Sequence, residues 1–90
     1  MTAITLGGAG ALLATRDHRV RLAAPSVRVV DTIGAGDTFM TSLICSLLED
    51  PSPPTATALE RAGTRAVNAA AITVSRAGAD LPWVRELSAR

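Results

Sequence analysis

The sequence predicts an α/β fold, and three of its features indicate this class. Short apolar or β-branched runs have the length of strands, at residues 3–6, 11–15, 19–22 and 27–30. Glycine-rich turns follow two of these runs, at residues 7–10 and 34–36. Two longer segments have the periodicity or alanine content of helices, at residues 35–48 and 57–74. Strand, glycine turn and helix in this order are typical of folds that bind ligands at the carboxyl ends of strands.

The first third of the chain is expected to form strands. Residues 3–6 are apolar and end at a glycine cluster, which predicts a short buried strand. The runs at residues 11–15 and 19–22 flank a polar turn and predict a hairpin. Residues 27–30 alternate and are β-branched, which predicts another strand.

Residues 35–48 predict an amphipathic helix with two different faces. Its large apolar side chains recur about every four residues and are expected to form the buried face: Phe39, Met40, Leu43, Ile44, Leu47 and Leu48. Its small side chains form a second face: Thr38, Thr41, Ser42 and Cys45. Among these we expect Cys45 to be buried as a small apolar group. The prolines after Asp50 end the helix.

A second helix is expected from the capping-box pattern at residues 57–60 to about Val74. Its many alanines would let it lie close to a sheet or to another helix. Gly78 is expected to end this region, and residues 82–87 to begin a last short helix.

Composition and charge narrow the possible functions. The chain has 90 residues, which limits it to one domain, residues 1–90. Nine basic residues, all arginine, balance eight acidic ones, and a net charge of +1 favours neither nucleic acid nor an anionic membrane as a partner. The single cysteine allows no internal disulfide and no thiolate metal site. No apolar run reaches the ~18–20 residues of a membrane span and the N-terminus lacks the features of a signal peptide, so we expect a cytoplasmic protein.

The strongest chemical signal is Gly34-Ala35-Gly36-Asp37, between a β-branched run and a helix. Glycines let the backbone approach a ligand closely, and the first amides of a helix attract anions. A phosphate group would bind well at this place. The Asp37 carboxylate could accept a proton from a hydroxyl that attacks a bound phosphoryl group, because this chemistry needs mainly positioning and charge stabilisation. From spacing alone, Asp37 could equally be a helix cap.

Two common nucleotide motifs are excluded. A Walker A loop requires Gly-Lys-Ser/Thr, and the chain contains no lysine. Neither glycine cluster fits G-x-G-x-x-G, so a Rossmann dinucleotide site is also excluded.

Residues 30–39, V-D-T-I-G-A-G-D-T-F, resemble the C-terminal signature D-T-x-G-A-G-D-x-F of ribokinase-like (PfkB) carbohydrate kinases. Residues 5–11, T-L-G-G-A-G-A, resemble the T-L-G-x-x-G-A segment of that family, and residues 68–79 resemble its alanine-rich helix and T-R-x-G-A turn. The resemblance covers nearly the whole chain and only the last third of such kinases. It implies the C-terminal part of a ribokinase-like three-layer αβα sandwich with an incomplete sheet.

The resemblance also implies an activity and its site. The reaction would transfer the γ-phosphoryl of ATP to a sugar hydroxyl, with Mg²⁺ bridging the phosphates. Fructose is favoured, because the motif followed by Met40 resembles fructokinase-type sequences. Asp37 would be the catalytic base, and an anion hole would come from the amides of Gly34, Ala35 and Gly36. ATP would be contacted by Thr5, Gly7, Gly10 and Asn68. A monovalent cation such as K⁺ would be held near Asp31, Ile33, Thr73, Arg76 and Gly78.

Three alternatives stay open. Asp31 could simply brace the loop by accepting backbone N–H bonds. The chain could be a truncated, non-catalytic remnant, since the sugar pocket and lid of such kinases lie outside the resembling region. It could also be a nucleotide- or anion-binding module that a partner chain completes, and full-length relatives suggest a homodimer as one arrangement. We expect the isolated chain to lack kinase activity.

Overall fold

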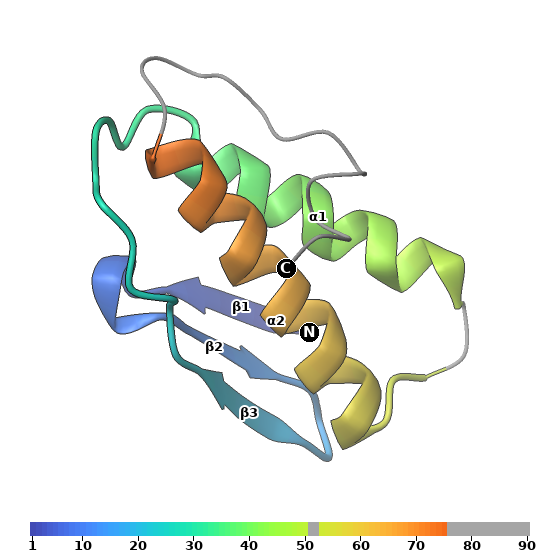
Figure 1. Cartoon of the computed structure of the whole chain (residues 1–90). Helices are drawn as coiled ribbons and strands as arrows, with labels where there is room; N and C mark the ends of the chain where they lie inside the picture. Colours follow the sequence, from blue (N-terminus) through green and yellow to red (C-terminus); the bar gives the residue numbers. More distant parts are fainter. Residues whose placement is uncertain (51–52, 76–90) are drawn as a thin grey trace.

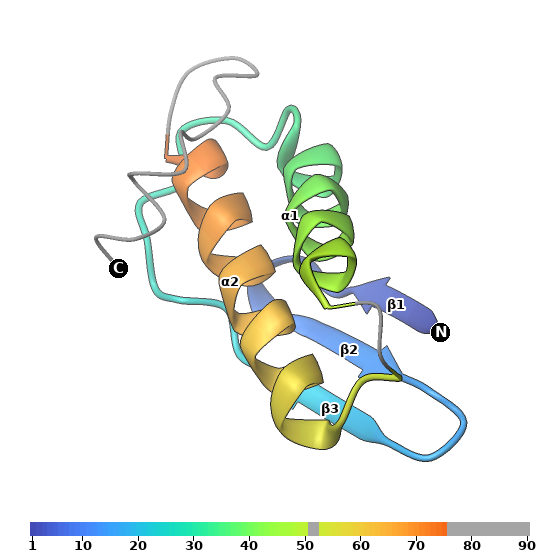
Figure 2. The ribbon, with the colours of Figure 1, turned by 90° about the vertical axis from the view of Figure 1, so that its right-hand side faces the viewer.

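A computed structural model describes residues 1–50 and 53–75 (Figure 1). The elements follow in the order β1 (Thr2–Thr5), the 3-10 helix η1 (Gly7–Ala9), β2 (Ala11–Ala14), β3 (Arg19–Leu22), α1 (Ala35–Glu49) and α2 (Ala56–Val74). Both helices lie on the same face of the sheet (Figures 1 and 2). The α/β prediction is confirmed, and the described residues form two of the three expected layers. The last helix expected at residues 82–87 lies outside the described residues.

The sheet is antiparallel, with strand order β1-β2-β3. Leu13 pairs with Ala3 on one side and with Val20 on the other, and Ala11 pairs with Leu22. Because side chains alternate along a strand, these residues share one face, and the helices cover it. Strands β2 and β3 are consecutive in the chain and pair antiparallel, so the predicted hairpin is confirmed.

Strand β1 differs from its prediction in burial. Only Ala3 is half-buried, and the other residues of the strand are exposed. Among the described residues β1 has a neighbour on one side only, so its outer edge carries unpaired backbone groups. The expected short buried strand is an exposed edge strand.

The prediction of a strand at residues 27–30 is wrong. The chain from residue 23 to 34 is irregular, and its backbone bonds go to the end of α2 instead: the N–H groups of Val30 and Asp31 donate to the Val74 carbonyl at 2.6 and 3.0 Å. A β-branched, alternating run forms a strand only where a second strand lies beside it, and the described residues place none there.

The core lies between the sheet and α2. Its buried cluster joins strands and both helices: Ala11, Leu13, Leu22, Phe39, Leu43, Ala62, Ala66 and Val67. The small residues on α2 let its backbone lie close to the sheet, as Gly63 shows. A Cβ at Gly63 would lie 2.1 Å from Cδ1 of Leu22 and 3.0 Å from Cδ1 of Leu13.

Substituting Gly63 with valine is therefore expected to destabilise the protein by about 2–3 kcal/mol, because overpacking exceeds the small gain in helix propensity. Urea denaturation followed by circular dichroism measures this loss. The matched control is Thr64→Val, at an exposed position on the same helix, which should change stability by less than ~0.5 kcal/mol. Equal effects at the two positions would contradict the close packing.

Helix α1 buries only part of its predicted apolar face, through Phe39 and Leu43, together with part of its small-residue face. Its buried residues are Thr38, Phe39, Ser42 and Leu43, so small side chains face α2 and permit close approach. Met40, Ile44 and Leu48 are 44%, 47% and 75% exposed and form a stripe along the opposite side. The prediction that Cys45 is buried is also wrong, because its side chain is exposed.

Helix α2 begins earlier than the capping-box pattern indicated. Thr55, and not Thr57, is the N-cap residue, and its Oγ1 accepts a hydrogen bond from the Ala58 N–H at 3.1 Å. Thr55 has the extended backbone that is usual for an N-cap residue, and Thr57 lies within the first turn. The predicted end of the helix at Val74 is confirmed.

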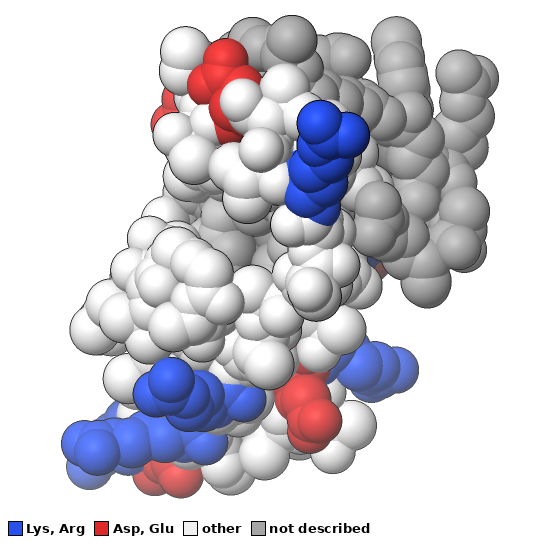
Figure 3. Space-filling view, turned by 60° about the vertical axis from the view of Figure 1, so that its left-hand side comes forward, with Lys and Arg blue, Asp and Glu red and all other residues white. Residues whose placement is uncertain are grey.

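The length and hydropathy of the helices and the distribution of charge describe the molecule further. Neither α1 nor α2, the helices in residues 1–50 and 53–75, combines the length and apolar character needed to cross a membrane. Figure 3 shows that the middle of one face carries no charge, while arginine and acidic side chains lie at both ends.

Candidate active site

The glycine turn that precedes α1 has a backbone that only glycine adopts easily. Gly34 is the N-cap residue, with φ of 83° in the left-handed region. Its carbonyl accepts the first helical bond from the Thr38 N–H at 2.9 Å, and the Ala35 N–H donates to the Thr32 carbonyl at 3.2 Å. The turn is thus held closed by its own backbone.

The amides of Gly36 and Asp37 lie between these two bonded groups. In the part of the chain that the structure describes, neither N–H has a backbone acceptor. Both residues are exposed, and a Cβ at Gly36 would meet nothing within 4 Å. Unpaired amides at the positive end of a helix dipole attract an anion, so the geometry suits a phosphoryl group.

Asp37 lies in the first turn of α1, beside these amides, and its side chain is exposed. The next residue, Thr38, is buried. The helix has no side-chain capping hydrogen bond at its N-cap position. The carboxylate therefore faces solvent at the end of α1 and not the apolar core. This position suits a proton-accepting group, because the substrate must be able to reach it.

Two neighbouring residues of α2 hold the loop that carries these groups. The hydroxyls of Thr38 and Thr73 are hydrogen-bonded at 2.9 Å and buried. The Val74 carbonyl accepts from Val30 and Asp31, as described above. Within the loop, Oδ1 of Asp31 accepts the Ile33 N–H at 2.9 Å. Asp31 does brace the loop, and this bond leaves the proposed cation role untested.

The residues expected to contact ATP lie on β1, on the turn that follows it and on α2. The turn between β1 and β2 contains Gly7, with φ of 58°, and Gly10, with φ of 99°. Figure 1 shows this turn at the same end of the molecule as the start of α1 and the end of α2. Thr5 is exposed at the end of β1, while Asn68 is half-buried on α2. Gly10 is buried against the backbone of β3, so a structural reason alone explains this glycine.

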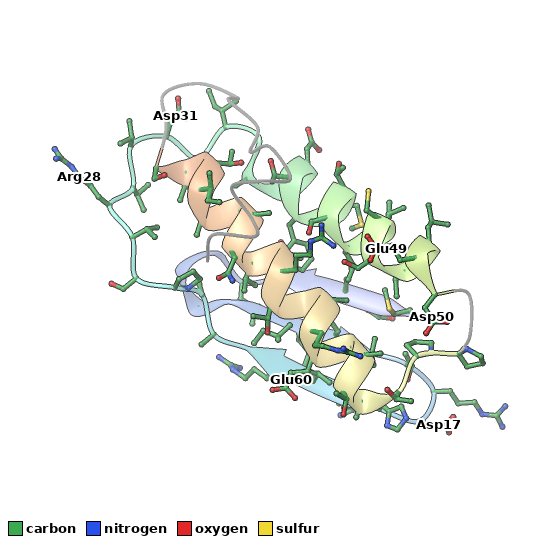
Figure 4. All side chains as sticks on the ribbon, turned by 45° about the vertical axis from the view of Figure 1, so that its right-hand side comes forward. Asp17, Arg28, Asp31, Glu49, Asp50 and Glu60 are labelled. Carbon is green, nitrogen blue, oxygen red and sulfur yellow. The ribbon has the colours of Figure 1, made fainter. Side chains whose placement is uncertain are left out.

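The residues expected near a monovalent cation are only partly described. Asp31 lies on the loop beside the C-terminal end of α2 (Figure 4). Ile33 follows on the same loop, and Thr73 is in the last turn of α2 with its side chain bonded to Thr38. Arg76 and Gly78 lie outside the described residues. Residues 1–50 and 53–75 contain no group of three or more His, Cys, Asp or Glu side chains that could hold a metal.

Local sequence patterns do not predict two of these contacts. They place Thr38 only on the small-residue face of α1 and Val74 only at the end of α2. They lie far apart in sequence from the groups that they bind, and in the Thr38–Thr73 pair the separation is 35 residues. Only the packing of α1 against α2 brings them together.

Comparison with known proteins finds sequence similarity to carbohydrate kinases. A family model described as pfkB family carbohydrate kinase matches residues 1–86. A fructokinase from Salmonella thompson is 38% identical over 87 residues, which are 94% of this chain and 39% of that protein.

Two solved structures are similar to the whole described fold. One is the aminoimidazole riboside kinase from Salmonella enterica, complexed with aminoimidazole riboside and an ATP analog, with a TM-score of 0.86, 36% identity and coverage of 97% of this chain and 30% of that one. The other is the fructokinase from Vibrio cholerae O395 in its fructose, ADP and calcium ion bound form, with a TM-score of 0.81, 30% identity and coverage of 97% and 29%.

The chain spans between 29% and 39% of the length of these three relatives. Within that span the glycine turn, the helix that it starts and the sheet beneath are those of one family, and the structural likeness confirms a partial ribokinase-like fold. The chain belongs to the pfkB family of carbohydrate kinases.

Proposed function

We propose that the chain provides the catalytic base and the phosphoryl-binding turn of an ATP-dependent sugar kinase. One observation carries the proposal: Asp37 is exposed in the first turn of α1, directly beside the Gly36 and Asp37 amides that have no backbone acceptor in the described residues. A base and an anion site in contact are the main groups that phosphoryl transfer needs from a protein.

The chemistry divides between these groups as follows. The Asp37 carboxylate accepts the proton of a sugar hydroxyl as its oxygen attacks the γ-phosphorus of ATP. The bond from that phosphorus to the bridging oxygen breaks, and ADP leaves. The amides of Gly34, Ala35 and Gly36 are proposed to form the anion hole for the transferring phosphoryl. The Gly36 N–H has no backbone acceptor in the described residues, whereas the Ala35 N–H donates to the Thr32 carbonyl at 3.2 Å and would have to leave it to bind the phosphoryl.

Thr5, Gly7, Gly10 and Asn68 are proposed to contact ATP. The position of the β1–β2 turn at the same end of the molecule as the glycine turn supports this proposal for Thr5 and Gly7. A K⁺ ion fits the oxygen donors of the Asp31 carboxylate and the backbone near Ile33 and Thr73, since hard cations prefer oxygen; Arg76 and Gly78 would complete its surroundings. Mg²⁺ does not fit the described residues in the same way, because they lack an acidic cluster, so we assign no residue of this chain to it.

Fructose is the proposed sugar. A fructokinase is 38% identical to this chain, and the similar Vibrio cholerae structure holds fructose and ADP. The groups that would bind the sugar's other hydroxyls are not among the residues assigned here.

A chimera tests the proposal. The segment of Vibrio cholerae fructokinase equivalent to this chain is replaced by residues 1–90, and ADP release with fructose is measured. We expect turnover, and Asp37→Asn should lower kcat by about 10²–10⁴-fold, the usual contribution of a positioned base. The matched control is Asp17→Asn, which removes an exposed carboxylate at the opposite end of the molecule from Asp31 (Figure 4), and it should leave kcat unchanged.

The two outcomes against the proposal are clear. Turnover that survives Asp37→Asn would exclude this carboxylate as the base. A chimera that folds, binds ATP and still has no turnover before any substitution would show that the segment does not perform the reaction.

A second candidate is an anion-binding module that a partner chain completes. The exposed stripe of Met40, Ile44 and Leu48 and the open edge of β1 favour it. The 90-residue chain, assayed alone with ATP and fructose, separates the candidates. Turnover that Asp37→Asn abolishes would exclude a module without activity of its own, and light scattering would show whether the active species is a homodimer.

A further inference from the structure

The last turn of α2 contacts the candidate site loop at both of its ends. Before the glycine turn, the Val74 carbonyl accepts from the Val30 and Asp31 N–H groups at 2.6 and 3.0 Å. After the turn, the Thr73 hydroxyl is bonded to the Thr38 hydroxyl at 2.9 Å. Thr73 and Val74 are adjacent in sequence, so two consecutive residues of α2 are linked to both sides of the loop.

The hydroxyl pair is the buried half of this arrangement. Thr73 is 0% exposed and Thr38 is 5% exposed. Away from water, a hydroxyl that loses its partner stays unsatisfied, so the pair favours one relative position of the two helices. A hydrogen bond depends on distance and angle, whereas apolar packing at the same place would tolerate sliding.

Thr38 directly follows Asp37 and receives no role from the resemblance. Its N–H already donates to the Gly34 carbonyl at 2.9 Å, so the same residue closes the turn with its backbone and joins α2 with its side chain. A shift of Thr38 would carry with it both the Asp37 carboxylate and the Gly36 amide. Small displacements of such groups have large effects on phosphoryl binding and transfer.

We infer that Thr38 and Thr73 are positioning residues, which set where the turn of residues 34–37 lies relative to α2 and thereby set its affinity for a phosphoryl group; this inference rests on the function proposed above. Together with the Val74 carbonyl they form a clamp, which we call the α2 clamp. Neither threonine touches the reacting atoms.

The 90-residue chain itself can test the clamp, with inorganic phosphate as the probe. The amide resonances of Gly36 and Asp37 are followed by NMR as phosphate is added to the parent and to variants. Thr38→Val and Thr73→Val preserve the shape of the side chain and remove the hydroxyl. Each is expected to weaken phosphate binding by about three- to tenfold. Thr38→Ser, which keeps the hydroxyl, should restore the parent affinity, and Thr41→Val, at an exposed position of α1, should leave it unchanged.

The double variant separates positioning from stability. Replacing both hydroxyls by apolar groups of the same shape leaves no unsatisfied partner, so the urea midpoint should return towards that of the parent. A positioning role predicts that phosphate affinity stays low in this variant. If affinity recovers together with stability, the pair is merely structural and the inference is overturned.

Hydrogen exchange measures the effect of the α2 clamp on the loop in the absence of any ligand. In Thr73→Val the amides of Val30 and Asp31 should exchange about tenfold faster, while those of β2 keep their parent rates. An equal change at all amides, or none at Val30 and Asp31, would overturn the clamp. If this local effect is present and the parent chain does not bind phosphate, the proposed anion hole fails and the clamp stands as a property of the fold.

Discussion

Alanine at position 10 is expected to lower the free energy of unfolding by about 4 kcal/mol or more, a loss that few single substitutions cause. Gly10 has φ of 99° and ψ of −137°, a conformation that side chains disfavour by about 1–3 kcal/mol. An added Cβ would also lie 1.8 Å from the Leu22 carbonyl oxygen and 3.0 Å from the Ala24 nitrogen. These are backbone atoms, which cannot rotate away, so β3 would have to move from the β1–β2 turn.

The matched control is Gly8→Ala, two positions earlier in the same turn. A Cβ there would meet nothing within 4 Å, and its φ is not positive. We expect a change of less than ~0.5 kcal/mol. Urea denaturation of both variants, followed by circular dichroism, measures the difference. A Gly10→Ala variant as stable as the control would show that the turn does not pack against β3 in this way.

Leu13→Ala should have the second-largest effect, a loss of about 3–4 kcal/mol. Leu13 is 0% exposed and belongs to the cluster that joins β2 to both helices. Truncation removes apolar contacts and leaves a cavity that rigid neighbours fill only in part. A domain of this size has a stability near the lower end of the ~5–15 kcal/mol range, so only about 1–2 kcal/mol should remain after the substitution.

Leu12→Ala is the matched control, because Leu12 is adjacent on β2 and faces the side of the sheet that the described helices leave open. Its side chain is half-buried, whereas that of Leu13 is fully buried. We expect a loss of only about 1 kcal/mol for Leu12→Ala, in proportion to its smaller burial. Thermal unfolding of the two variants gives the comparison. Equal losses would mean that both faces of the sheet are covered to the same degree.

Signals between residues close in sequence predicted much of the fold correctly. The hairpin followed from two apolar runs separated by a polar turn, and α1 followed from its amphipathic period and the prolines after it. The position of Gly34 before α1 also followed from local chemistry, because a residue with positive φ at a helix start favours glycine. The site hypothesis itself depended on one contiguous stretch, residues 30–39.

Where partners lie far apart in sequence, local patterns failed. Residues 27–30 have strand composition, yet Val30 bonds to the end of α2. Met40 and Ile44 belong to the apolar period of α1, yet they are exposed because α2 packs against the small-residue side. The apolar periodicity and strand propensity of a segment indicate which structure it can form when another segment packs against it. They do not indicate which segment that is.

By itself, the sequence determined the helices, the hairpin and the glycine turn, because each follows from residues close together in the chain. The resemblance of residues 30–39 to a family signature made Asp37 the candidate base. Only the tertiary structure decided which face of α1 is buried, that residues 27–30 form no strand, and that Thr38 meets Thr73. The physical reason is that these outcomes depend on contacts between segments that are not adjacent in sequence, 35 residues apart in the case of Thr38 and Thr73. Close packing of α1 on α2 selects one arrangement among several that the local patterns allow.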